Sequence, residues 1–188
     1  MNSSARVRFT TIKDLLGAFP TAAVDVGVEA SDEPTLAFLH RSVAAGDYRA
    51  AISLCAYLLP RREAVWWACG CLRPLEPRTP GESRCLDLAE DWVRVPEEEQ
   101  RRAALEFGLQ SSRKLPGTWV ALGAGWSGGN MSSSDTYRIA PAPQLTAQAI
   151  RAALLIAAAT PPAEVSKARQ KEWIGAASPL LLGESLQR

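Results

Sequence analysis

The chain has little of what usually reveals a chemistry. Among its 188 residues there is one histidine, His40, so a histidine-based catalytic or metal site has little to draw on. The 21 basic and 20 acidic residues nearly cancel. Without a Lys/Arg-rich block, the chain lacks the electrostatic footprint of a nucleic-acid-binding protein. We therefore expect no nucleic-acid partner.

Long hydrophobic runs are also missing. The longest weakly charged apolar run, 152–159, is far shorter than the roughly 20 residues that span a bilayer. Residues 1–10 are polar and resemble no signal peptide. We therefore expect a cytoplasmic protein without a membrane span, whose four cysteines stay reduced because stable disulfides are rare in that compartment. The sequence leaves the oligomeric state open.

Helix signals recur along the chain, whereas strand signals are scarce. Asp47 can cap a helix that continues until Pro60 ends it, and Thr79 to Glu82 matches a capping box with proline at the first helical position. Residues 145–160 form an alanine-dense segment. These signals predict an all-α fold, a single compact bundle of about eight helices arranged as antiparallel hairpins with one long Gly/Ser loop. We expect a variable N-terminal segment with one short helix at 1–30 and a helical domain at 31–188.

The most unusual segment runs from Leu59 to Gly70, where a proline and an Arg-Arg-Glu triplet precede two adjacent tryptophans. On a helix, Trp66 and Trp67 point about 100° apart. Together with their apolar neighbours they leave almost no polar side, which is typical of a helix buried in a core. The candidate partner-binding or structural residues of this segment are Arg61, Arg62, Glu63, Trp66 and Trp67.

The charged triplet Arg61, Arg62 and Glu63 allows three interpretations. It could be a solvated helix start, a recognition patch suited to bidentate carboxylate binding, or an internal ion-pair network. We favour the internal network, with Glu90, Asp91 or the acidic run 97–99 as partners.

A Gly/Ser-rich stretch at 127–134 follows Trp126. Long loops in compact domains are often functional, which makes it a candidate binding loop with the residues Trp126, Ser127, Gly128, Gly129 and Asn130. Residues 125–129 fit the G-x-S-x-G nucleophile elbow, for which residues 119–122 could supply the strand, but that fold places its histidine after the serine. Residues 123–128 fit G-x-G-x-x-G without the helix and acid that a dinucleotide site needs. We therefore assign no catalytic residue.

The spacing of the cysteines invites a metal hypothesis, because Cys55 to Cys69 and Cys71 to Cys85 are each 14 positions apart. Zinc accepts four thiolates. However, Cys69 and Cys71 point in nearly opposite directions on a helix, and free cysteine packs as a small hydrophobe. We therefore expect core packing, with no metal and no cofactor.

Several segments of the chain resemble a bacterial domain-of-unknown-function family. They are the tryptophan block 59–69, the segments 89–93, 96–97 and 101–104, Trp119, and the loop 127–129. The hallmark of that family is an L-P-x-R-E-A-V-W-W-A block, and the similarity covers most of the chain from about Ser31 onward. The resemblance implies an all-helical protein without an established activity, often encoded beside type VI secretion genes. It supplies no catalytic residues.

The sequence and the resemblance together favour a non-enzymatic cytoplasmic interaction protein. We expect an adaptor or chaperone-like accessory that binds an effector or a component of type VI secretion. The alternative is a small-ligand-binding protein or enzyme that uses the Gly/Ser-rich loop near Ser127. Whether the C-terminal leucines, up to Leu186, belong to the core or to an interface stays open.

Overall fold

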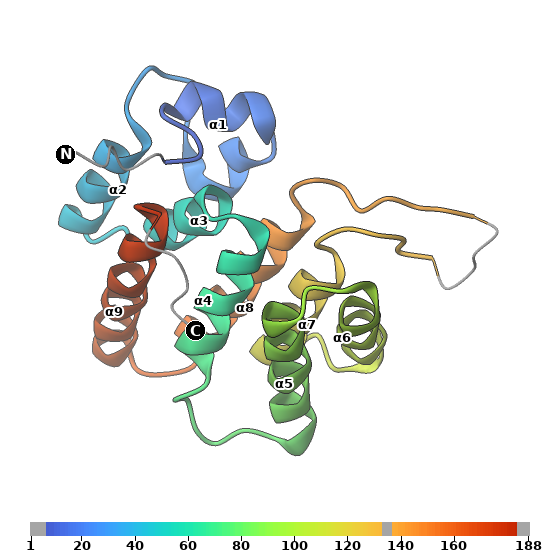
Figure 1. The fold of residues 1–188 in the computed structure, drawn as a ribbon. Helices are drawn as coiled ribbons and strands as arrows, with labels where there is room; N and C mark the ends of the chain where they lie inside the picture. The colour runs from blue at the N-terminus through green and yellow to red at the C-terminus, as the bar shows by residue number, and fades with distance from the viewer. Residues whose placement is uncertain (1–6, 133–136, 184–188) are drawn as a thin grey trace. The chain divides into compact units, whose positions relative to one another are not determined.

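The computed structural model describes residues 7–132 and 137–183, and within them the chain is all-helical, without strands. Nine α-helices and one short π-helical turn confirm the predicted fold class (Figure 1). No helix of the described residues is long and apolar enough to cross a membrane. Residues 133–134 of the Gly/Ser-rich stretch, and Leu186, lie outside the described residues.

The helices group into two compact units, which are described separately. Unit 1 comprises residues 1–60 and 158–188, and unit 2 comprises residues 61–157. The division into 1–30 and 31–188 stays a prediction. The described part of the N-terminal segment contains α1 (Ile12–Ala18) and η1 (Ala23–Gly27), and it buries Ile12, Leu15 and Val26.

Unit 1 also contains α2 (Thr35–Ala44), α3 (Tyr48–Leu58) and α9 (Ala163–Leu181). The side chain of Asp47 accepts a hydrogen bond from the Ala50 amide, as predicted for the cap of α3. Every residue from Ala50 to Leu59 is buried, and α3 packs against α2, η1 and α9. Helix α3 is therefore enclosed on all sides. The sequence predicted this instead for the helix that carries Trp66 and Trp67.

The last helix, α9, continues past Trp173 and Ile174 to Leu181. Pro179 lies in its final turn, where a missing amide proton removes a single hydrogen bond. Among the C-terminal leucines, Leu181 is buried and Leu182 is exposed.

Unit 2 consists of α4 (Arg61–Leu72), α5 (Pro80–Arg94), α6 (Glu98–Gln110) and α7 (Pro116–Gly125), followed by a long loop and most of α8 (Leu145–Ala159). Helices α5, α6 and α7 pack against one another in pairs, and α4 packs against α5 and α7 (Figure 1). Helix α7 includes residues 119–122, so the possible strand at that place is wrong.

Glycines allow α7 to pack closely within unit 2. A Cβ atom on Gly125 would lie 2.6 Å from the Cβ of Leu105 on α6, and one on Gly123 would lie 3.0 Å from the Cδ1 of Ile150 on α8. The G-x-G-x-x-G string therefore begins inside a packed helix. Its first two glycines serve helix contacts rather than a phosphate-binding turn.

Candidate functional site

The tryptophan helix α4 has one exposed stripe and one buried face. Arg62, Trp66 and Gly70 are exposed at intervals of four residues, whereas Val65, Trp67 and Cys69 are buried. Trp66 is 42% exposed and Trp67 only 3%. The prediction of a helix apolar and buried on all sides is therefore wrong, because this helix meets its neighbours α5 and α7 through the other face.

The arginines of α4 are bonded internally, but their acceptors are backbone carbonyls. Arg62 Nε donates to the carbonyl of Val93 at 2.7 Å, and Arg61 Nη1 donates to the carbonyl of Ser127 at 2.6 Å. Within the described part of the chain, no ion pair joins Arg61, Arg62 or Glu63 to another residue. The favoured network with Glu90, Asp91 or the run 97–99 is therefore wrong in its partners. Glu90 pairs with Arg73, Asp91 with Arg94, and Glu98 with Arg101 and Arg102.

Arginines bind the carboxyl ends of four consecutive helices in unit 2. Arg78 donates to the carbonyl of Leu72, the last residue of α4, and to that of Leu75 just after it. Arg62 donates to the carbonyl of Val93 in α5. Arg113 donates to the carbonyl of Gly108 in α6, and Arg101 to that of Gly125 in α7. The last carbonyls of a helix lack hydrogen-bond donors within the helix and carry partial negative charge. A guanidinium group supplies both the missing donors and a compensating positive charge.

The beginning of α7 receives the opposite charge. Glu82 is 8% exposed, and its Oε1 atom accepts a hydrogen bond from the amide of Gly117 at 3.1 Å. In the predicted capping box, the Thr79 side chain accepts a hydrogen bond from the Glu82 amide. The Glu82 carboxylate, however, binds the first turn of α7 rather than the backbone amide of Thr79. Carboxylates stabilise the positive end of a helix dipole.

The long loop between α7 and α8 has an ordered base, built around Asn130. The Oδ1 atom of Asn130 accepts hydrogen bonds from the amides of Ser132 (3.0 Å) and Ile139 (2.8 Å). The amide of Met131 donates to the carbonyl of Ile139 at 2.9 Å. The two bonds of Ile139 join the two arms of the loop. In Figure 1 these arms leave the helices of unit 2 as extended chain.

Three arginines fasten this loop to the helices α4 and α6. Arg101, on α6, donates through Nη2 to the carbonyl of Asn130 at 3.0 Å, and its neighbour Arg102 donates to that of Ser132 at 3.0 Å. Arg61, on α4, bonds the carbonyl of Ser127 on one arm and, at 3.4 Å, that of Pro143 on the other. We call the segments 126–132 and 137–144 the anchored loop.

Arg101 is the central residue of this anchor. Its side chain is 4% exposed, and it forms a two-point pair with Glu98, with Nε–Oε2 and Nη2–Oε1 distances of 2.7 and 2.6 Å. The hydrogen bond from Arg101 lowers the pKa of the Glu98 carboxyl, and the nearby charge of Arg102 acts in the same direction. The pair is therefore intact at neutral pH, and its contribution to stability is lost as the pH falls through that lowered pKa.

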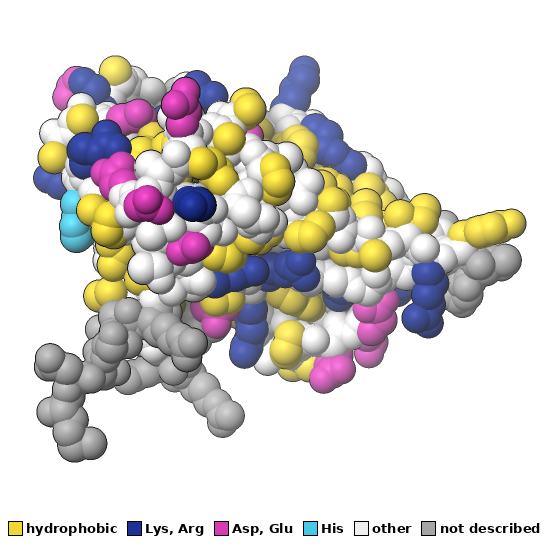
Figure 2. All heavy atoms as spheres, turned by 90° about the horizontal axis from the view of Figure 1, so that it is seen from above, with side chains coloured by type: hydrophobic (Ala, Val, Ile, Leu, Met, Phe, Trp, Pro, Cys, Tyr) yellow, Lys and Arg dark blue, Asp and Glu magenta, His cyan; other side chains and the backbone are white. Residues whose placement is uncertain are grey.

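The second arm of the anchored loop presents apolar side chains to solvent. Tyr137 is 73% exposed and Ile139 is 55% exposed, and Arg138 between them is exposed as well. In Figure 2, hydrophobic side chains lie along the visible face of the projecting part, with basic side chains beside them. Sequence reasoning placed the candidate binding residues at 126–130, which form the base of the loop, and missed the exposed residues 137–139.

The predicted loop residues have mainly structural partners. Ser127 is bonded through its backbone to Arg61, and it follows a helix rather than the strand that a nucleophile elbow needs. His40, on α2, is exposed. No group of three or more His, Cys, Asp or Glu side chains within residues 7–132 and 137–183 could hold a metal ion. All four cysteines are buried and free, and burial raises the pKa of the Cys55 thiol to about 12.

Residues 38–181 match a family of unknown function, DUF6931. The chain belongs to this family. The match includes all of unit 2, with the tryptophan helix, and about half of unit 1, so the arginine anchors and the anchored loop lie within the family domain. No curated protein and no solved structure matches the chain.

Gly129 gives a direct test of the anchor. Its φ angle is +66°, and a Cβ there would lie 2.6 Å from Arg101 Nε, whereas a Cβ on Gly128 would meet open space. We expect Gly129→Ala to displace the loop from Arg101, and Gly128→Ala to leave it in place. In the first variant, hydrogen exchange at the amides of Met131 and Ile139 should accelerate at least tenfold. Equal exchange rates in the two variants would show that Arg101 does not hold the loop.

Proposed function

We propose that this chain is a non-enzymatic cytoplasmic interaction protein that binds a protein partner through the anchored loop. Exposed aromatic and aliphatic side chains on a preordered backbone are typical of protein-binding surfaces, because little conformational entropy is lost on binding. The observation that carries the proposal is the exposure of Tyr137 and Ile139 on a loop fastened by Arg61, Arg101 and Arg102.

The family resemblance supports a particular class of partner. It implies an effector or a component of type VI secretion, for which the chain would serve as an adaptor or chaperone-like accessory. A fastened loop suits that role, because it can recognise one segment of a partner while the helical units keep their own fold.

The exposed stripe of α4 is the competing surface. Trp66, with Arg62 beside it, could contact a partner, since tryptophan and arginine are enriched at binding hot spots. We favour the anchored loop because Tyr137 and Ile139, at 73% and 55%, are each more exposed than Trp66, at 42%.

The proposal is tested by affinity capture from the native host. A tagged chain should retain one partner in stoichiometric amount, and the double variant Tyr137→Ser/Ile139→Ser should retain at least tenfold less of it. The matched control is Val165→Ser on α9, which removes an apolar side chain that is 48% exposed. Undiminished capture by the double variant would place the interface elsewhere, and the absence of any stoichiometric partner would contradict the proposed function.

A further inference from the structure

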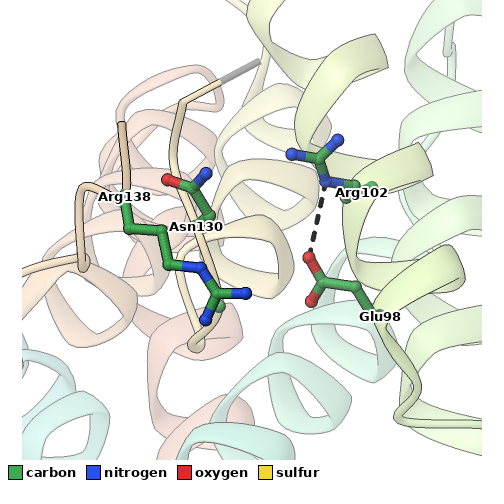
Figure 3. Close-up of a pocket in the computed structure, with 5 residues that line it drawn as sticks. Glu98, Arg102, Asn130 and Arg138 are labelled. Carbon is green, nitrogen blue, oxygen red and sulfur yellow. Dashed lines mark ion pairs between the residues drawn. The ribbon is translucent and has the colours of Figure 1, made fainter. Parts of the chain in front are cut away.

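A hollow of about 450 Å³ lies at the base of the anchored loop, lined by Glu98, Arg102, Gly129, Asn130 and Arg138. Glu98 and Arg102 come from the first turns of α6, and the other three come from the two arms of the loop. Figure 3 shows the guanidinium group of Arg138 extending from the loop toward Glu98, with Arg102 on the α6 side. The hollow therefore lies entirely within unit 2.

The charges around this hollow do not balance. Among the lining residues within 7–132 and 137–183, Glu98 is the only acid, and both oxygens of its carboxylate bond to the buried Arg101. Arg102 also lies 3.4 Å from Glu98, but one carboxylate offsets only one of three positive charges. Two positive charges remain, on Arg102 and Arg138. Such an excess attracts an anionic group, and guanidinium groups match the planar geometry of a carboxylate with two parallel hydrogen bonds.

The size of the hollow favours a peptide over a small free anion. Its volume falls within the roughly 300–1,000 Å³ of ordinary ligand pockets, whereas a single water molecule takes about 30 Å³. An inorganic anion would therefore leave most of the space unfilled, and an acidic side chain with its adjoining backbone would fill more of it.

We propose that the hollow binds a Glu or Asp side chain from an acidic segment of the protein partner, with Arg102 and Arg138 contacting its carboxylate. This inference rests on the proposed function, since it specifies the chemistry of the partner that the anchored loop contacts. Arg138 is the specificity-determining residue. It is exposed, and it takes no part in the hydrogen bonds that hold the loop.

The test is isothermal titration calorimetry, which measures the affinity of the full chain for a capped tetraglutamate peptide. A capped tetraglutamine peptide is the uncharged control. Arg138→Gln should weaken tetraglutamate binding at least tenfold. Arg84→Gln on α5 removes the same charge from another exposed position and should leave binding within twofold of the wild-type value. Raising the salt concentration should weaken the wild-type interaction, because the contacts are between exposed charges.

Three results would overturn the inference: no tetraglutamate binding, equal binding of tetraglutamine, or equal losses in Arg138→Gln and Arg84→Gln. Inorganic phosphate provides a further arm. If it binds in an Arg138-dependent manner as tightly as the peptide, the hollow is a site for free anions rather than for an acidic segment. If tetraglutamate fails to bind while partner capture still depends on Tyr137 and Ile139, only this inference fails. If the peptide binds but no partner is ever captured, the proposed function fails instead.

Discussion

Replacing Trp67 with alanine is expected to lower the free energy of unfolding by about 3–5 kcal/mol, the usual cost of truncating a core tryptophan. Trp67 is 3% exposed, whereas Trp66 is 42% exposed on the adjacent position of the same helix. Trp66→Ala should therefore lower the free energy of unfolding by only about 1 kcal/mol, because much of that side chain already contacts water.

Urea denaturation followed by circular dichroism measures both values. The pair of variants is informative because the two residues are of one type, lie at adjacent positions of one helix and differ in burial. Equal losses of stability would mean that Trp66 is as well packed as Trp67, which would contradict the division of α4 into an exposed stripe and a buried face.

Replacing Arg101 with alanine is expected to have the second largest effect, a loss of about 2–4 kcal/mol. The substitution removes the hydrogen bonds that Arg101 donates to the carbonyls of Gly125 and Asn130. The bond to Gly125 is buried, and an unsatisfied buried polar group costs about 1–3 kcal/mol. Arg102→Ala on the same helix should cost about 1 kcal/mol, because that side chain is 31% exposed and exposed ion pairs contribute little.

Arg101→Lys distinguishes the geometry of the guanidinium group from its charge. Lysine keeps the charge but loses the planar fork, so it should restore less than half of the lost stability. Denaturation measures the loss in each variant, and hydrogen exchange at the loop amides reports whether the anchor is broken. If lysine restored full stability, or if Arg102→Ala were the more harmful of the two alanine variants, Arg101 would not be the central anchor.

Local signals in the sequence predicted much of the fold. The cap at Asp47, the break at Pro60 and the alanine-dense helix α8 depend on residues within a few positions of one another, and the structure contains all three. Exposure along α4 was not predictable in the same way. It depends on which neighbouring helices contact α4 and on which face, and the apolar composition of the helix does not specify that.

The candidate site was predictable only in part. The unusual composition of the loop singled out residues 126–130, but the exposed residues 137–139 carry no comparable signal. The arginine contacts are equally hidden, since the hydrogen bonds from Arg62 to Val93 and from Arg61 to Ser127 join positions 31 and 66 residues apart. Such pairs depend on how the helices pack, and the nearby acids in the sequence suggested the wrong partners.

The central claim, that the anchored loop is the interaction surface, is tested most directly by photo-crosslinking in the native host. A photoreactive phenylalanine analogue would replace Tyr137 in one variant and Trp66 in another, because these are the exposed aromatic residues of the two competing surfaces. We predict a covalent adduct with one host protein at position 137 and none at position 66. An adduct at position 66 with none at position 137 would contradict the claim and would assign partner binding to the exposed stripe of α4.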